Sequence, residues 1–515
     1  MTSGMRADGA RADGARADAA LAGARRLSDA LPADWLEQQA VLPLRVEDGT
    51  LVVASWLDAP APLALDELRI RLGHPLVLQR FPEQAVRNAI RRLYAQESST
   101  AEGVIAGLAL DDELGTRPGE LPLDDLVHLA NEAPVVRLVN LLILEALEAR
   151  ASDVHLEGFA DGLRVRYRID GVLQPAPSPP PHLTAAIISR LKIMADLDIA
   201  ERRLPQDGRI RLRLQDRAVD VRVATAPTLH GESVVLRLLD RERGRRSLGE
   251  MGMGADVLVG FGEVIGRTHG IVLVTGPTGS GKTTTLYAAV EQLRTGREKI
   301  LTVEDPIEYE LAGVPQVPVN EKVGVTFAAA LRALLRQDPD ILLVGEIRDE
   351  ETAQVATQAA LTGHLVLSTL HTNDAPSAVT RLLDLGVPPY LVASTLEAVL
   401  AQRLVRVLCR QCRREAIPDP RHLQRLGLPA TALERVWQAV GCPQCRDTGY
   451  RGRQGIFELL VMSEALRDLT QSRASGDQLR AMAVREGMLP LRDDGLRLVR
   501  EGVTTLDEVL RVAGS

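Results

Sequence analysis

Aromatic residues are scarce in this chain: phenylalanine, tryptophan and tyrosine make up 3% of its 515 residues. Because 45% of the residues are nevertheless hydrophobic, we expect cores built mainly from leucine, valine, isoleucine and alanine. No apolar run approaches the roughly 18 residues that a membrane-spanning helix needs, and no secretory leader follows Met1. We therefore expect an intracellular protein that reaches a membrane only through a partner.

Positive charge is also in deficit. The chain has 61 lysine and arginine residues against 69 aspartate and glutamate residues, which gives a formal net charge of −8 at pH 7. A protein without an overall basic field is a poor candidate for moving along nucleic acid, although a local basic channel would escape this count. We expect no nucleic acid among its partners.

Changes of pattern along the chain predict several domains. Arg-Ala-Asp-Gly-Ala repeats within residues 1–26 have too little apolar bulk to form a core, so we expect a disordered tail there. Residues 27–95 predict a small α/β domain, with a strand at residues 51–54 and a helix at residues 83–94. The acidic, glycine-containing residues 96–120 are typical of a linker.

Residues 121–240 predict a second domain that contains an antiparallel sheet. Apolar and charged residues alternate strictly at residues 163–170, so one face is apolar and the other carries Arg164, Arg166 and Arg168. Residues 209–214 and 219–223 repeat the alternation, and an apolar helix pattern precedes them at residues 135–149. The pattern indicates a half-buried sheet with a basic face.

Short apolar runs alternate with helix patterns over residues 255–400, which is typical of a parallel sheet covered by helices. Residues 461–515 predict helices, with breaks at Gly487 and Gly495. The expected fold class is therefore α/β.

A phosphate-binding loop is the most specific motif. Residues 276–283 read G-x-x-x-x-G-K-T directly after the apolar run at 271–274. Lys282 would reach the β- and γ-phosphates of ATP, and the hydroxyl of Thr283 would bind Mg²⁺. The residues expected to contact the nucleotide are Gly276, Pro277, Thr278, Gly279, Ser280, Gly281, Lys282, Thr283 and Thr284.

Polar clusters accompany three further strands of this region, and ligands bind at the carboxyl ends of such strands. Glu304 and Glu346 are the predicted catalytic carboxylates, each at the end of an apolar run. His371, which follows the fourth strand, would sense the γ-phosphate. Three further residues are expected to contact the cofactor or its metal shell: Asp305, Glu308 and His364.

Cysteine is nearly absent, and its four residues form two C-x-x-C pairs separated by 29 residues. Four thiolates in this arrangement suit structural Zn²⁺, with no open position for catalysis. A redox dithiol and a nucleic-acid zinc ribbon are the alternatives. The predicted ligands within a subdomain at residues 401–460 are Cys409, Cys412, Cys442 and Cys445.

The four boxes resemble those of the secretion ATPase superfamily that powers type II secretion and type IV pili. Members carry a Walker A loop, an aspartate box, a Walker B box and a histidine box, which match residues 276–283, 302–308, 340–349 and 363–373. Residues 151–157, 166–172, 204–209 and 228–232 also look like this family. The sequence of residues 203–209 and the overall length of the chain favour its type II secretion (GspE-like) branch.

The resemblance implies a RecA-like P-loop core, preceded by a PAS-like α+β domain and a small N-terminal α/β domain. It also implies a homohexamer with ATP between two domains, a structural zinc insertion, and transition-state arginines at Arg209, Arg222 and Arg237. The N-terminal domain would dock on the cytoplasmic domain of an inner-membrane platform protein, the GspL-like component. ATP hydrolysis would then power protein export across the outer membrane.

Three alternatives remain open at this point. A type IV pilus assembly (extension) ATPase shares every box and the four cysteines. A nucleic-acid translocating ring ATPase belongs to another class, and so does a nucleotide-binding scaffold without turnover, against which Lys282 and Glu346 argue. Some relatives bind cyclic di-GMP with an N-terminal domain of this kind, through a repeated Arg-Leu-Gly…Gln-Leu pattern. Only one Arg-Leu-Gly segment, at residues 71–73, occurs within residues 27–95, so cyclic di-GMP is left unassigned as a ligand.

Overall fold

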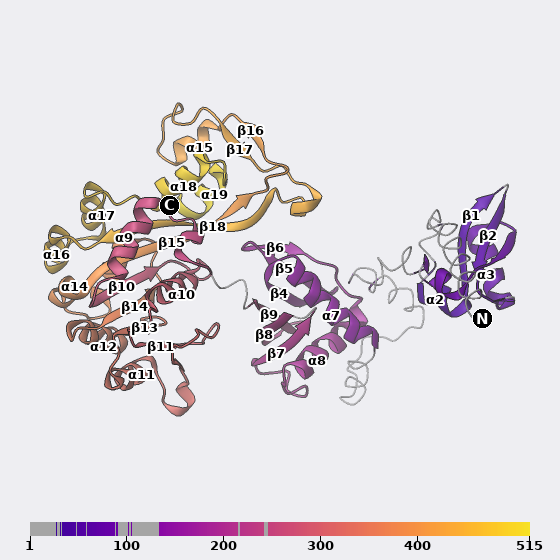
Figure 1. Cartoon of the computed structure of the whole chain (residues 1–515), viewed down its shortest axis with the longest axis horizontal. Helices are drawn as coiled ribbons and strands as arrows, with labels where there is room; N and C mark the ends of the chain where they lie inside the picture. Colours follow the sequence, from indigo (N-terminus) through magenta and orange to yellow (C-terminus); the bar gives the residue numbers. More distant parts are fainter. Residues whose placement is uncertain are drawn as a thin grey trace, which may run out of the picture. The chain divides into compact units, whose positions relative to one another are not determined.

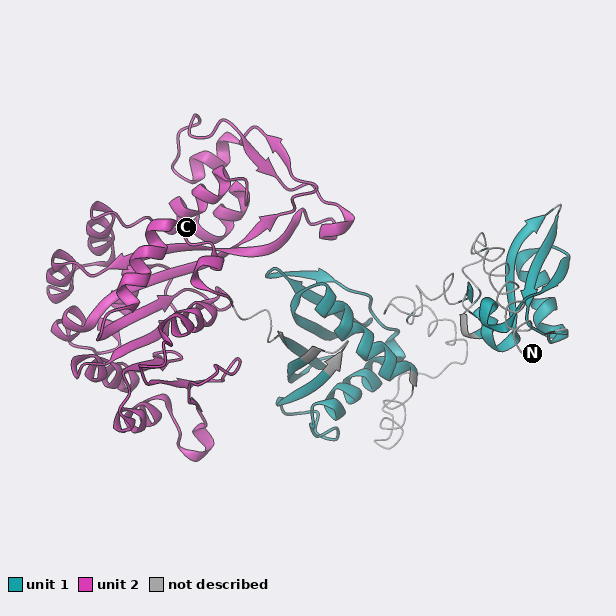
Figure 2. Cartoon of the chain, viewed as in Figure 1, with its two compact units in different colours: residues 1–239 teal, residues 240–515 magenta. Residues whose placement is uncertain are grey.

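The computed structural model describes residues 27, 31, 33–47, 49–57, 59–87, 89–90, 101, 105, 133–214, 217–240 and 246–514. The predicted tail at residues 1–26 lies outside these residues, and so does the predicted linker at residues 96–120 apart from two positions. The chain divides into two compact units, residues 1–239 and residues 240–515 (Figure 2). None of the helices in the described ranges has both the length and the apolar character that crossing a membrane requires.

The N-terminal part of the first unit is a three-stranded sheet with helices packed on it (Figure 1). Strand β1 (Val41–Glu47) is antiparallel to β2 (Thr50–Ser55), and α3 (Pro62–Leu72) connects β2 to the parallel strand β3 (Leu76–Arg80). Its core joins leucine and valine residues of these strands to α2 (Ala33–Gln39) and α3. The strand predicted at residues 51–54 is confirmed, and so is the helix predicted from residue 83 as far as it is described.

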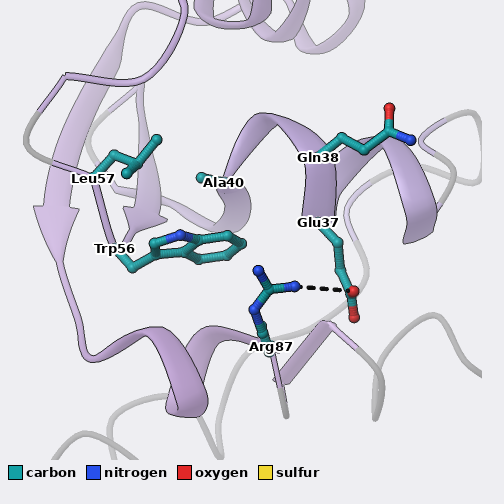
Figure 3. Close-up of a pocket in the computed structure, with 6 residues that line it drawn as sticks. All are labelled: Glu37, Gln38, Ala40, Trp56, Leu57 and Arg87. Carbon is teal, nitrogen blue, oxygen red and sulfur yellow. Dashed lines mark hydrogen bonds and ion pairs between the residues drawn. The ribbon is translucent and has the colours of Figure 1, made fainter.

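A surface cavity of about 450 Å³ lies in this domain (Figure 3). The guanidinium of Arg87 lies 4.8 Å from the centre of the Trp56 ring. Arg87 also forms ion pairs with Glu37 (3.3 Å) and Glu83 (2.9 Å). The stack therefore ties α2 to the end of β2 and to the helix that begins at residue 83, and it neutralises the charge of the arginine.

The rest of the first unit is an α+β domain with a six-stranded sheet in the order β6-β5-β4-β9-β8-β7. Helices α7 (Ala133–Glu148) and α8 (Thr184–Met194) supply apolar residues to a core on one face of the sheet. The half-buried antiparallel pairing predicted for residues 209–214 and 219–223 is confirmed by the register of β7 with β8. The strands are β4 (Ala151–Phe159), β5 (Gly162–Ile169), β6 (Val172–Pro175), β7 (Gln206–Leu214), β8 (Arg217–Thr228) and β9 (Gly231–Asp240).

The charged face of this sheet is partly neutralised by acids that the sequence pattern alone did not pair. Arg166 forms an ion pair of 2.6 Å with Glu157, and Arg168 lies 3.7 Å from Asp153. On the opposite, apolar face, a buried pair of 2.5 Å joins Lys192 of α8 to Glu232 of β9. The predicted basic face is thus a mixed one, and these arginines are held by neighbouring carboxylates.

The second unit is built on a seven-stranded sheet in the order β12-β11-β13-β14-β10-β15-β18. The pairs from β12 to β15 are parallel, and β18 is antiparallel to β15. The parallel sheet predicted for residues 255–400 is therefore confirmed. Its strands are β10 (Gly270–Thr275), β11 (Ile300–Glu304), β12 (Gln316–Pro318), β13 (Ile341–Val344), β14 (Leu365–Leu370), β15 (Leu396–Leu408) and β18 (Tyr450–Val461).

Helices cover both faces of this sheet. Successive side chains of a buried strand point to opposite sides, so each strand contributes to two separate cores. Ile271 and Leu273 of β10 belong to one core, whereas Val272 and Val274 belong to another. The first core includes α11 (Phe327–Leu334), α12 (Glu350–Leu361), α13 (Ala375–Asp384), α14 (Pro389–Thr395), α16 (Glu464–Gln471) and α17 (Gly476–Arg485). The second includes α9 (Ala255–Ile265) and α10 (Lys282–Leu293).

Residues 409–449 form an insertion between the long strands β15 and β18. It carries β16 (Arg414–Ala416), α15 (Pro420–Arg425) and β17 (Val436–Gln438), and it shares a small core with α18 (Leu491–Arg500) and α19 (Leu506–Ala513). Gly495 lies inside α18, so the predicted break there is wrong. A Cβ on Gly495 would lie 2.8 Å from Val509 Cγ1, so this glycine allows α18 and α19 to approach closely.

A buried carboxylate fastens α19 to β15. Glu508, whose side chain is 1% exposed, pairs with Arg406 at 2.9 Å and with Arg511 at 2.5 Å. It also accepts a hydrogen bond of 3.1 Å from the main-chain nitrogen of Arg406. Burial opposes ionisation, but the hydrogen bonds from the two arginines lower the pKa of Glu508 to about 2.

We expect Glu508→Gln to lower the free energy of unfolding by about 1–3 kcal/mol at pH 7, since it replaces a buried carboxylate that accepts hydrogen bonds from two partly exposed arginines. Chemical denaturation followed by circular dichroism measures this difference. Because the folded-state pKa is lowered, the stabilisation is present above the ordinary carboxyl pKa and is lost as the pH falls toward 2. The difference in free energy of unfolding between Glu508→Gln and the parent protein should therefore become smaller in acid.

The exposed pair of Arg435 with Glu415, at 2.8 Å, provides a matched control. Glu415→Gln should change stability by no more than about 1 kcal/mol. Equal effects of the two substitutions would contradict the role of Glu508.

Candidate active site and metal centre

Glycines shape the loop between β10 and α10. Gly276, Gly279 and Gly281 have φ angles of 146°, 79° and 90°, which other residues rarely adopt. A Cβ on Gly276 would lie 2.4 Å from the main-chain oxygen of Gln402, and one on Gly281 would lie 2.9 Å from Gln402 Nε2. The loop thus lies closely against β15, and its conformation suits phosphate binding at the start of α10.

Side chains of the loop fit a phosphate ligand. The Nζ of Lys282 donates hydrogen bonds to the carbonyl oxygens of Gly276 (2.8 Å) and Pro277 (3.2 Å). The hydroxyl of Ser280 is buried and has no hydrogen-bond partner among the described residues. Thr283 is exposed at the first turn of α10. Burial lowers the pKa of Lys282 to about 8, although the carboxylate of Glu346 acts to raise it.

Hydrogen bonds between neighbouring strands hold the loops at this edge together. The hydroxyl of Thr275, at the end of β10, lies 2.7 Å from that of Thr372. The main-chain nitrogen of Gly345 donates to the carbonyl of Val303 at 2.8 Å, and the hydroxyl of Thr369 donates to the carbonyl of Gly345 at 2.8 Å. The carboxyl ends of β10, β11, β13 and β14 therefore form one edge.

Two of the predicted catalytic residues meet at this edge. The Nε2 of His371 lies 3.1 Å from Glu346 Oε2. The guanidinium of Arg348 pairs with the other carboxylate oxygen of Glu346, and its Nη1 lies 3.7 Å from Asp305 Oδ2. Asp349 is the N-cap of α12, since its side chain accepts a hydrogen bond from the main-chain nitrogen of Thr352. The boxes after β13 and β14 thus meet at Glu346, and Arg348 connects them to the box after β11.

Glu304 is held apart from this cluster. Its side chain is buried and accepts hydrogen bonds from Tyr287, from Thr302 (2.6 Å) and from Gln316 (2.9 Å). All its observed partners belong to a buried polar network at the end of β11. Glu308 follows in the segment after β11, where it is partly buried.

His364 lies at the opposite edge of the sheet. It precedes β14, and its main-chain oxygen accepts a hydrogen bond from Gly270 at the start of β10. Its Nδ1 lies 2.9 Å from the carbonyl oxygen of Ala359. Because β10 and β14 are parallel, the length of a strand separates His364 from the phosphate loop. This placement argues against the predicted contact with the nucleotide.

The three predicted arginines lie in the first unit. Arg209 of β7 is directly opposite Arg222 of β8 in the antiparallel ladder. The Nε of Arg237 in β9 lies 3.1 Å from Asp153 Oδ1. Arg209 and Arg222 are thus neighbours in the ladder, and Arg237 is paired with a carboxylate.

Sequence reasoning gave no role to two residues of this site. Arg348 lies within the box that contains Glu346, so its position was a usable signal. Gln402 of β15 supports the phosphate loop and accepts a hydrogen bond of 2.6 Å from Thr285 of α10. Its distance along the chain from the loop hides this contact from any local pattern.

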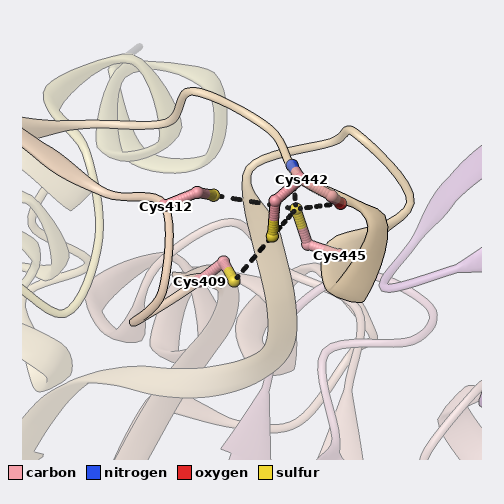
Figure 4. A group of neighbouring side chains, drawn as sticks. All are labelled: Cys409, Cys412, Cys442 and Cys445. Atoms are coloured by element: carbon pink, nitrogen blue, oxygen red, sulfur yellow. Dashed lines mark hydrogen bonds between the residues drawn. The ribbon is translucent and has the colours of Figure 1, made fainter.

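The four cysteines come together at the two turns of the insertion (Figure 4). Their sulfur atoms all lie within 4.8 Å of one another, and three of the distances are 3.9, 3.8 and 3.7 Å. Tetrahedral zinc with bonds of about 2.3 Å places its sulfur ligands about 3.8 Å apart, whereas a disulfide needs about 2.05 Å. The cluster is therefore suited to hold a metal ion.

Main-chain groups favour a thiolate in this cluster. The nitrogen atoms of Cys442 and Gly449 each donate a hydrogen bond of 3.2 Å to the sulfur of Cys445. Burial opposes ionisation, but these donors lower the pKa of the Cys445 thiol to about 7. Such contacts orient metal-binding thiolates.

Comparison with known families decides the assignment. The family described as "Type II/IV secretion system protein" matches residues 128–511, which is most of the chain. The chain belongs to this family. An MshEN domain matches residues 16–100.

Curated relatives of this family member are secretion and pilus proteins. It is 47% identical to the type II secretion system protein HxcR of Pseudomonas aeruginosa, over 94% of this chain and 98% of that protein. It is 47% identical to the type II secretion system ATPase E of Vibrio cholerae, over 88% of this chain and 91% of that protein. It is 45% identical to the type IV pilus assembly ATPase PilB of Myxococcus xanthus, over 93% of this chain and 85% of that protein.

A solved structure supports the same fold. The ATPase DotB of Yersinia pseudotuberculosis superimposes with a TM-score of 0.56 at 19% identity, over 78% of this chain and 97% of that chain. The predicted family and the predicted α/β fold with a RecA-like core are therefore confirmed.

We expect ATP binding to weaken as the pH rises above about 8. The ammonium of Lys282 loses its proton there in the nucleotide-free protein, whereas phosphates would keep it charged, so affinity should fall by up to about tenfold per pH unit. Titration calorimetry at pH 7, 8 and 9 measures this. Lys282→Arg stays charged throughout this range and should give a flatter profile. Constant affinity of the parent protein from pH 7 to 9 would contradict the expectation.

We expect freshly purified protein to contain about one zinc ion per chain. Cys442→Ser should lose it and lower the unfolding temperature by several degrees, because a closed site needs all four sulfurs. Elemental analysis and a thermal melt measure both effects, and Gln444→Ser in the same turn is the matched control. A metal-free protein whose cysteines form disulfides would favour the redox alternative.

Proposed function

We propose that this protein hydrolyses ATP to power protein export by a type II secretion system. The observation that carries this is the convergence of a phosphate loop with Glu346 and His371 at one edge of a parallel sheet. Relatives of nearly full length are type II secretion proteins, which supports this branch. The similar pilus assembly ATPase keeps the extension of type IV pili as a second candidate.

The residues divide the work of phosphoryl transfer among them. The loop from Gly276 to Gly281 and the ammonium of Lys282 would bind the phosphates, and Thr283 would bind Mg²⁺. Mg²⁺ supplies neutralisation of the phosphate charge when it is bound. Glu346 would orient the attacking water, and His371 would report the presence of the γ-phosphate. Glu304 fits a supporting role, because its carboxylate is occupied by the network around Tyr287.

Arg209, Arg222 and Arg237 are the candidates for an arginine that reaches a nucleotide within an assembled ring. Arg237 would first have to share or leave Asp153. We propose a homohexamer for this purpose, as the family resemblance implies.

The remaining parts would anchor and stabilise the motor. The N-terminal domain, with its own core, would dock on the cytoplasmic domain of an inner-membrane platform protein. The protein would therefore be cytoplasmic and attached to the membrane only through that partner. Zinc held by the four cysteines would stabilise the insertion without taking part in catalysis.

We expect Glu346→Gln to bind ATP normally but to lower kcat by at least about 100-fold, since the carboxylate acts on the water and not on the nucleotide. Nucleotide binding and phosphate release are measured on full-length protein, with and without the partner's cytoplasmic domain. The control is Glu351→Gln, a residue of the exposed pair with Arg332 on nearby α12. Normal turnover by Glu346→Gln would refute its assigned role.

The cellular role is tested in a strain that lacks the gene. Exported enzymes should accumulate in the periplasm, and the parent gene but not Glu346→Gln should restore their export. Loss of surface pili with normal export would support the pilus candidate instead. Hydrolysis that is stimulated by polynucleotide and falls steeply with salt would indicate a nucleic-acid motor.

A further inference from the structure

The edge formed by the carboxyl ends of β10, β11, β13 and β14 is here called the active edge. Arg348 links two of the boxes that lie along it. Its guanidinium pairs with Glu346, which follows β13, and lies 3.7 Å from Asp305, which follows β11. The side chain of Arg348 is 54% exposed, whereas that of Glu346 is 15% exposed. An exposed cation is thus bound to the more buried of two carboxylates that come from separate strands.

The main chain around Arg348 is fixed on both sides. The nitrogen of Gly345 is hydrogen-bonded to β11, and that of Ile347 donates to the carbonyl of Thr369 in β14 at 3.0 Å. Asp349 caps α12. Arg348 therefore projects from a segment whose position is set by two strands and a helix. The base of its side chain is fixed relative to Glu346 and Asp305.

The carboxylate of Glu346 is gripped at both oxygens. Oε2 lies 3.1 Å from His371, and Oε1 pairs with Arg348. A carboxylate held at two points cannot turn about its terminal bond, and a planar guanidinium with several donors is the side chain best suited to such a hold. Removal of Arg348 would leave His371 as the only side chain of the described residues that is seen to hold the carboxylate.

We propose that Arg348 is a positioning residue for the hydrolysis reaction, which orients the carboxylate of Glu346 by bridging it to Asp305. This rests on the proposed role of Glu346 as the residue that orients the attacking water. Arg348 itself touches neither nucleotide nor water in this mechanism. Its effect is therefore on the chemical step and not on the binding of ATP.

The alternative is that Arg348 is an ordinary surface arginine. Exposed ion pairs contribute little to stability, and many contribute nothing measurable. The pair of Arg332 with Glu351 in the same unit is of this kind: it is 2.6 Å long, and its arginine is 50% exposed. Arg332→Ala is therefore the matched control, because it removes an equally exposed guanidinium from a carboxylate outside the cluster.

The test compares steady-state kinetics of full-length variants. We expect Arg348→Ala to lower kcat by about tenfold or more, with KM and ATP affinity within about twofold of the parent. Arg348→Lys should recover part of the loss, since an ammonium keeps the charge but cannot bridge two carboxylates as a planar fork does. Arg332→Ala should match the parent.

A second comparison asks whether Arg348 acts through Glu346. In single-turnover measurements, Arg348→Ala should have no further effect in protein that already carries Glu346→Gln. A further loss in that background, a raised KM with unchanged kcat, or equal activity of Arg348→Ala and Arg332→Ala would each overturn the proposal. Melting temperatures identify a variant that is merely unfolded, and Arg348→Lys then decides the case.

The outcomes also separate this inference from the proposed function. Full turnover by Glu346→Gln would refute the role of Glu346, whatever Arg348→Ala does. Loss of turnover in Glu346→Gln together with parental kinetics of Arg348→Ala would refute only the positioning role.

Discussion

The active edge depends on the close contact between the phosphate loop and β15. Neither Gly276 nor Gly281 has room for a side chain above Gln402, so the loop can lie flat only with glycine at both positions. Gln402 in turn accepts a hydrogen bond from Thr285 in the first turns of α10. Strand β15 therefore sets the position of the phosphate loop and the direction of α10, which follows the loop. Gln402 therefore helps to position both the loop and the start of α10.

The features that local sequence determines were predictable. Buried parallel strands are short apolar runs, and the phosphate loop is a contiguous motif, so β10, β11, β13 and β14 could be located with their terminal clusters. The strict alternation at residues 163–170 likewise predicted a strand with one apolar face. The four cysteines could be assigned together because spacing restricts what two C-x-x-C pairs can do.

The features that tertiary packing determines were not predictable. Glu304 ends its strand on the side that faces Tyr287 and Gln316, and a pattern of neighbours along the chain does not reveal which side that is. His364 was grouped with its strand without regard to direction, yet a parallel strand brings only its carboxyl end to the site. Gly495 looked like a helix break, whereas its purpose is to admit Val509 of the next helix. In each case the deciding contact or strand direction belongs to the tertiary structure and not to the local sequence.

The insertion between β15 and β18 is continuous with the catalytic sheet. Strand β15 runs without interruption from Leu396, past Gln402, to Leu408, directly before the first cysteine. Thirteen residues at about 3.3 Å each make a rod of roughly 40 Å. The phosphate loop lies against Gln402 at the middle of this strand, and the same hydrogen-bonded backbone reaches Cys409 seven residues later, which is roughly 23 Å at about 3.3 Å per residue. Tilting the cysteine-bearing end of β15 would therefore move the residue that supports the phosphate loop.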